Sequence, residues 1–157
     1  MVQIGNALQE RAETLETTRW VSEFSWKEIE NMARYFVVSK KEKGMTVFLE
    51  GDHEKYMCLV VWGSVNVIKK DAKQQEKILS VIGKSNIFGE MMLFDGEPRS
   101  ATIVAAEPTV LLILSQENLD RLVREIPVLA AKLLWKLGRI LSQRLRMTSG
   151  KLIDFID

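Results

Sequence analysis

The stretch FGEMMLFDGEPRSAT, residues 88–102, carries the most informative pattern in the chain. Gly89 and Glu90 stand at the start of an expected short helix, and Arg99 follows ten residues after Gly89. The opening of a helix presents unpaired backbone N–H groups and a positive dipole end, which attract an anion. Gly89 has no side chain to keep a ligand from the backbone, and a guanidinium can bind two oxygens of one phosphate. The pattern predicts a phosphate site.

Glu90 indicates what accompanies the phosphate. A carboxylate repels phosphate, but it accepts a hydrogen bond from a sugar hydroxyl, and Arg99 partly offsets its charge. A sugar hydroxyl beside a compact phosphate describes a cyclic nucleotide. The alternative is a surface loop with an internal Glu90–Arg99 pair and no ligand.

Short runs rich in β-branched residues surround this stretch and are separated by Gly, Asp, Lys and Pro. Runs of this length at even spacing predict a jelly roll or a closed barrel. Residues 88–102 fall between the fourth and fifth runs, and an interruption of that kind is usually functional. The runs are MTVFLE (45–50), KYMCLVVW (55–62), SVNVIKK (64–70), KILSVI (77–82), SATIVAA (100–106) and TVLLIL (109–114).

Helices are expected before the strands. Asn6 or Gly5 can open a first helix that runs towards Trp20. Ser25 as N-cap with Glu28 three residues later forms a capping-box pattern for a second helix. Helices are therefore predicted within residues 1–43.

Helices are also expected after the strands. Ser115 is a plausible N-cap of a short helix, and Pro127 in a first-turn position opens a long one. The predicted fold class is therefore α+β in a single domain: an antiparallel β-roll or jelly roll over residues 44–114, with N-terminal helices and C-terminal helices over 115–157.

This combination resembles the cyclic-nucleotide-binding domain family, whose phosphate cassette matches residues 88–102. The resemblance covers roughly residues 25–150 and is strongest to the cyclic-AMP receptor branch. Further family markers are Gly44, LEGD at 49–52, VVWGSVNV at 60–67 and Gly83.

The resemblance implies a role for each cassette residue. Glu90 would take the ribose 2′-hydroxyl, and Arg99 the cyclic phosphate. Backbone N–H groups of Gly89, Ser100 and Ala101 would add donors, together with the Ser100 hydroxyl. The ligand would be cyclic AMP, with cyclic GMP as the alternative.

Met91 opens an apolar tetrad, Met91 to Phe94, that is expected to form the buried face of the short helix. Contact of a member such as Met91 with the purine or sugar is the alternative, so Met91 is included in the candidate site.

Thr148 and Ser149 lie in LRMTSGK, residues 145–151. By resemblance, hydroxyls at these positions of the long helix meet the adenine amino group, one from each subunit. The alternative is an ordinary pair on the helix surface.

The long helix also carries a near-heptad repeat, which is typical of two helices packed along their length. It predicts a homodimer, and packing of the same residues on their own barrel is the alternative. Cationic residues on another stripe indicate a solvated face or a docking surface for an acidic downstream protein partner. The repeat is Leu137, Leu141, Leu145, Thr148, Leu152 and Phe155, and the cations are Lys132, Lys136, Arg139 and Arg146.

Composition limits the remaining classes of function. A formal net charge of +1 gives no global attraction to DNA or an acidic membrane, so direct DNA binding is not expected of the chain as given. No apolar run approaches the ~20 residues that span a bilayer, and residues 1–16 do not read as a signal peptide. The single cysteine, Cys58, favours a reducing cytoplasm. The only histidine, His53, supports neither a metal site nor a His-dependent triad, so the chain is expected to be no enzyme and to need no cofactor.

Overall fold

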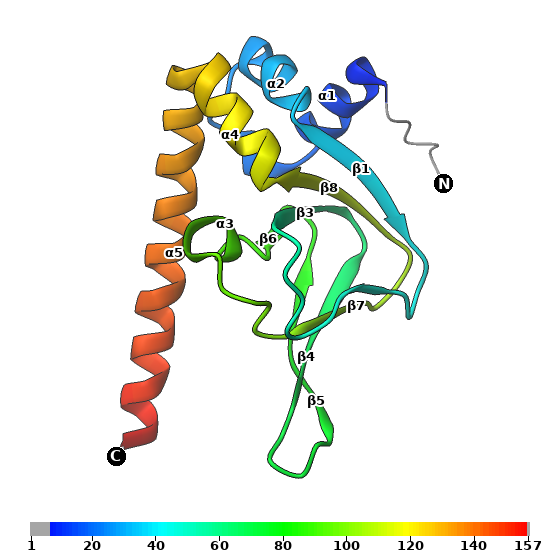
Figure 1. Ribbon diagram of the computed structural model, residues 1–157, viewed down its shortest axis with the longest axis vertical. Helices are drawn as coiled ribbons and strands as arrows, with labels where there is room; N and C mark the ends of the chain where they lie inside the picture. Colours follow the sequence, from blue (N-terminus) through cyan, green and yellow to red (C-terminus); the bar gives the residue numbers. More distant parts are fainter. Residues whose placement is uncertain (1–6, 157) are drawn as a thin grey trace. The chain divides into compact units, whose positions relative to one another are not determined.

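The computed structural model describes residues 7–156, and the chain divides into two compact units, Met1–Leu119 and Asp120–Asp157. The first unit holds all the described strands and the cassette (Figure 1). The second holds the end of α4 (Gln116–Glu125) and the long helix α5 (Pro127–Ile156).

Two four-stranded antiparallel sheets build the first unit, which confirms the predicted β-roll with flanking helices (Figure 1). One sheet has the order β1-β8-β3-β6, and the other has the order β2-β7-β4-β5. The eight strands are β1 (Phe36–Lys41), β2 (Thr46–Phe48), β3 (Tyr56–Trp62), β4 (Ser64–Lys70), β5 (Glu76–Gly83), β6 (Ile87–Phe88), β7 (Thr102–Ala105) and β8 (Thr109–Ser115).

The core of this unit is apolar and draws on both sheets. It contains Phe48, Cys58, Val60, Val65, Phe88, Ile103 and Leu111. Burial raises the pKa of the Cys58 thiol to about 12, so this residue is a small core hydrophobe and not a reactive thiolate.

All six predicted runs are strands, but two further strands were not anticipated. Strand β1 lies inside residues 1–43, for which helices were predicted, so that part of the prediction was wrong. Residues 36–41 pair with residues 114–109 of β8. This long-range pairing outweighs the helical spacing of the apolar residues Ile29, Met32, Ala33 and Phe36 in the sequence. Strand β6 has two residues and pairs through Cys58↔Phe88 and Leu59↔Ile87.

The N-terminal helical signals are largely confirmed. Helix α2 (Trp26–Ala33) begins after Ser25, whose Oγ accepts from Glu28 N at 3.2 Å while Glu28 Oε1 accepts from Ser25 N at 2.9 Å. Helix α1 (Leu8–Glu16) ends earlier than predicted, and a 3-10 turn (Arg19–Val21) follows. The proposed start at Gly5 or Asn6 lies outside the described residues.

The C-terminal signals are confirmed as well. Asn118 N donates to Ser115 Oγ at 3.1 Å at the start of α4, and Pro127 is the first residue of α5. Of the predicted leucine repeat, Leu137 is fully buried in the single chain, whereas Leu145 and Leu152 are 67% and 60% exposed. The side chain of Phe155 lies outside the described part.

Candidate functional site

The cassette leaves the sheet at a glycine with positive φ. Strand β6 ends at Phe88, and Gly89 has φ +75°, a conformation that side chains disfavour. Helix α3 (Met92–Asp95) follows and ends at Gly96 in the left-handed region. The predicted short helix is therefore present, two residues after Glu90.

Backbone hydrogen bonds fix Arg99 against the turn that precedes β3. Arg99 N donates to Asp52 O at 2.9 Å, and Gly51 N donates to Arg99 O at 2.8 Å. The turn is itself closed, because Leu49 N donates to Asp52 Oδ2 at 2.9 Å. The LEGD run thus serves to hold the main chain of the arginine.

The side chain of Arg99 is held by three backbone carbonyls. Its Nη1 donates to Gly89 O at 2.8 Å, and its Nη2 donates to Glu54 O at 2.9 Å and to Tyr56 O at 2.6 Å. Three of the five N–H groups of the guanidinium are therefore engaged. Nε is buried and has no partner in the described part of the chain.

Two aromatic rings flank the same guanidinium. Arg99 Cζ lies 4.0 Å from the centroid of the Phe48 ring and 4.7 Å from that of Tyr56. The two rings meet edge to face, with centroids 6.1 Å apart. We call Arg99 with Phe48, Glu54, Tyr56 and Gly89 the arginine corner.

Burial dominates the electrostatics of the corner. Arg99 is only 5% exposed, and desolvation lowers its pKa below the usual value. Desolvation likewise raises the pKa of the Tyr56 hydroxyl to about 12. Tyr56 is therefore neutral at pH 7, whereas the guanidinium keeps its charge.

Gly89 is required by the corner for a second reason. A Cβ at this position would lie 2.7 Å from Arg99 Nη1 and 3.3 Å from Phe48 Cε2. Its absence lets the guanidinium reach the main chain of the cassette.

Glu90 is 4% exposed and lies beside the corner in sequence. The polar partners of Arg99 among the described residues are the three carbonyls, and the Glu90 carboxylate is not one of them.

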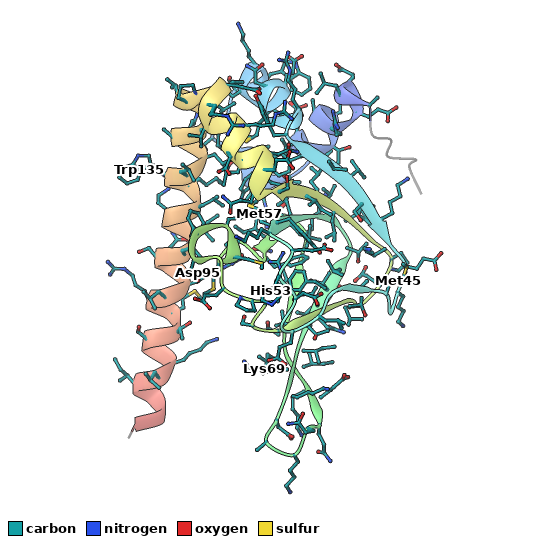
Figure 2. The ribbon with its side chains drawn as sticks, viewed as in Figure 1. Met45, His53, Met57, Lys69, Asp95 and Trp135 are labelled. Carbon is teal, nitrogen blue, oxygen red and sulfur yellow. The ribbon has the colours of Figure 1, made fainter. Side chains whose placement is uncertain are left out.

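Ser100 is exposed and Ala101 is half-buried, at the entry to β7. A further cation reaches this point: Lys69 Nζ, labelled in Figure 2, donates to Ser100 O at 3.2 Å and lies 3.6 Å from Glu50 Oε1. No pattern in the sequence predicts that Lys69 lies here.

Residues 91–94 were all expected to lie in the core, and this was wrong for two of the four. Met92 and Leu93 are buried, but Met91 is 57% exposed and Phe94 50% exposed. The four-residue helix can turn only one side inward. Exposure leaves Met91 available as a ligand contact, as the alternative required.

Thr148 and Ser149 lie in the second unit, on α5, and both are exposed. Thr148 Oγ1 donates to Arg144 O of its own helix at 2.9 Å. Their contact with a base remains a prediction.

Sequence reasoning missed the aromatic half of the corner. Phe48 and Tyr56 were placed in strands, but nothing local shows that their rings meet Arg99. The carbonyls of Glu54 and Tyr56 carry no side-chain signal at all. The sequence contains one clue: Phe48 and Tyr56 lie on either side of the LEGD turn, and the backbone of that turn binds the backbone of Arg99.

Two searches of the described residues bear on other functions. No group of three or more His, Cys, Asp or Glu side chains lies close enough to hold a metal ion among them. None of the described helices combines the length and apolar character needed to cross a bilayer.

A family model described as "cyclic nucleotide-binding domain" matches residues 38–125, more than half of the chain. The match includes the complete cassette and the LEGD turn. A cyclic AMP receptor protein of Thermus thermophilus is 34% identical over 119 residues, which cover 76% of this chain and 53% of the relative. A cAMP-activated global transcriptional regulator of Mycobacterium tuberculosis is 28% identical over 114 residues, 73% of this chain and 49% of the relative. The chain thus spans about half the length of these curated relatives.

Solved structures agree with the sequence matches. A cyclic nucleotide-binding domain from Methylobacillus flagellatus superposes with a TM-score of 0.83 at 31% identity, covering 97% of this chain and 87% of that one. The Thermus thermophilus catabolite activator protein gives a TM-score of 0.74 at 32% identity, covering 85% and 61%.

Proposed function

The chain belongs to the cyclic nucleotide-binding domain family, and from this premise we propose that it is a regulatory sensor domain that binds cyclic AMP. Binding is the whole of the proposed chemistry. The family is one of ligand-binding regulatory domains, which agrees with the expectation that the chain is no enzyme.

The observation that carries the proposal is the arginine corner. Arg99 is held 2.8 Å from Gly89 O, next in sequence to the buried Glu90. A fixed cation close to a glycine backbone without a side chain suits a phosphate, and a neighbouring carboxylate suits a ribose hydroxyl. We assign Glu90 to the 2′-hydroxyl and Arg99 to the phosphate, with Gly89, Ser100 and Ala101 supplying backbone N–H donors.

The predicted two-oxygen grip on phosphate would require a change at Arg99. Both edges of a guanidinium that present two parallel N–H groups include Nη2, and Nη2 already donates to Glu54 O and Tyr56 O. Phosphate therefore meets one of the two N–H groups that have no partner, on Nη1 and Nε, or a guanidinium that has given up a carbonyl. In the first case Arg99 acts chiefly through its charge.

The signal would pass through the C-terminal helix, with a homodimer formed at Leu145 and Leu152. The exposure of these leucines supports that assembly. A ligand can shift α5 between two positions only if it binds the protein more tightly when the helix is in one of them than in the other. The downstream partner would be a protein that reads the position of α5.

Isothermal titration calorimetry with cyclic AMP and cyclic GMP tests the proposal. We expect saturable binding of cyclic AMP at one site per chain, and weaker binding of cyclic GMP. Absence of heat with either nucleotide, at high micromolar protein, would show an idle pocket whose arginine serves the fold alone. The occupied Nη2 is the observation that favours this second reading.

A third reading places the same sensor in a transcription regulator, because the curated relatives carry that description. The nucleotide site would be the same in both cases. Calorimetry on this chain therefore tests the site whichever effector is attached to it.

A further inference from the structure

The cation of the arginine corner is stabilised without being neutralised. The groups that contact the guanidinium are three backbone carbonyls and two aromatic rings, all of them uncharged. The carboxylates of Asp52 and Glu54 also act on it electrostatically and raise its pKa, but by less than burial lowers it. A buried arginine paired with a carboxylate would present no net charge to a ligand, whereas this one does.

Such an arrangement needs compensation for the water that the guanidinium has lost. Carbonyl oxygens supply it as hydrogen-bond acceptors, and the negative faces of aromatic rings supply it by electrostatic attraction. The centroid distances of 4.0 Å to Phe48 and 4.7 Å to Tyr56 are inside the range of a cation–π contact. Together with the three carbonyls, the two rings limit where the guanidinium can move.

We propose that Phe48 and Tyr56 are positioning residues of the anion site, whose rings hold Arg99 in place with its positive charge uncompensated and available to the phosphate of the ligand. The inference rests on the proposed function and deepens it. Loss of either ring face lets the guanidinium adopt other conformations, so ligand binding must then order it again, at a cost in affinity.

Tyr56 offers a matched pair of substitutions. Tyr56→Phe keeps the ring and removes only the hydroxyl, which donates to Val47 O at 3.3 Å. Tyr56→Leu removes the ring. Phe48→Leu tests the other face, and Phe36→Leu is its control, because Phe36 is equally buried but belongs to β1 and contacts Trp20 instead of Arg99.

Two measurements are made on each variant. The first is the ¹⁵N–¹H resonance of Arg99 Nε in the ligand-free protein, assigned through its loss in Arg99→Lys. A ring face close to the guanidinium shifts this resonance, and the measurement requires no ligand. The second is the dissociation constant for cyclic AMP by calorimetry.

We expect Phe48→Leu and Tyr56→Leu to move the Nε resonance and to weaken binding of cyclic AMP by roughly threefold to thirtyfold. Tyr56→Phe and Phe36→Leu should retain both the resonance and the affinity of the parent. If Phe48→Leu does not fold, the Tyr56 pair decides the question.

Parent-like affinity in Tyr56→Leu, or equal weakening in Phe36→Leu, overturns the proposal. A parent that binds no cyclic AMP contradicts the proposed function instead. The proposed role of the rings is then judged by the Nε resonance alone. If neither Phe48→Leu nor Tyr56→Leu moves this resonance, the proposal is overturned.

Discussion

The arginine corner and the far half of α5 break the usual distribution of side chains in opposite ways. The corner buries a cation, Arg99, whereas the helix exposes apolar side chains at Leu145, Met147, Leu152 and Ile153. Charged residues are seldom fully buried unless they are paired, and clustered exposed apolar residues mark interaction surfaces.

The two regions differ in whether these unusual side chains have partners within the chain. Arg99 finds three carbonyls and two rings within the first unit. Leu145 and Leu152 of α5 have no comparable cover, and Trp135, nearer the start of the helix, also projects into solvent at 73% exposure (Figure 2). This difference supports the proposal that the corner meets a small anion and that the exposed part of the helix meets another protein surface.

The largest effect is expected from Arg99→Ala. It removes the only buried cation of the corner, so cyclic AMP affinity should fall by roughly 2–5 kcal/mol in binding free energy. Because three carbonyls lose their donor, folding should also weaken, by about 1–3 kcal/mol. Calorimetry and urea unfolding measure the two effects.

Arg99→Lys is the matched control. It keeps a charge but cannot donate to three carbonyls in one plane. Affinity between those of the parent and the alanine variant is expected. Parent-like binding by the alanine variant would make the cassette assignment wrong.

Leu145→Glu tests the helix side of the comparison. If Leu145 and Leu152 form a two-fold seam, each substitution places two carboxylates in one interface, and the dimer should dissociate to monomer. Sedimentation velocity measures the change. Gln143→Glu adds the same charge at an exposed position about 200° around the helix and should remain dimeric. A parent that is monomeric at high micromolar concentration, with or without nucleotide, removes the seam.

Gly89→Ala should produce an intermediate effect. The positive φ costs about 1–2 kcal/mol for a residue with a Cβ, and that Cβ would lie 2.7 Å from Arg99 Nη1. Weaker folding and weaker cyclic AMP binding are both expected. Gly44→Ala separates the causes, because Gly44 has φ +85° and no heavy atom within 4 Å of the added Cβ. It should lose stability and keep affinity.

How much the sequence predicted depends on how local each feature is. The Ser25–Glu28 capping box, the Ser115 cap and the start of α5 at Pro127 are contained in a few adjacent residues, and all three are present. Strand β1 was missed because its partner, β8, lies about 70 residues away in the chain, from Phe36↔Leu114 to Lys41↔Thr109.

The site divides in the same way. The cassette motif marked Gly89, Glu90 and Arg99 directly, and the structure brings Arg99 to Gly89. The rings of Phe48 and Tyr56 and the carbonyl of Glu54 come from separate segments that only the fold assembles. Backbone carbonyls cannot be recognised from side-chain patterns, so the hydrogen bonds that hold the guanidinium could not be predicted from the sequence.

The smallest expected effect concerns the base. Replacing both Thr148 and Ser149 with Ala should erase a preference for cyclic AMP of roughly 3- to 15-fold, the worth of one net hydrogen bond, while leaving phosphate binding intact. Guanine has a carbonyl where adenine has an amine, and a hydroxyl can rotate to donate to it, so discrimination is incomplete. Competition between the two nucleotides measures the ratio. Tighter binding of cyclic GMP by the parent would contradict the assignment.

The most direct test of the central claim is a titration of the ligand-free protein with cyclic AMP, followed at the guanidinium resonances of Arg99. If Arg99 meets the phosphate, its Nε and Nη signals should shift and saturate at one nucleotide per chain. The signals of Arg121, which pairs with Glu125 on α4, should stay in place. Saturable binding that leaves the Arg99 signals unmoved, or no response at millimolar cyclic AMP, would contradict the account.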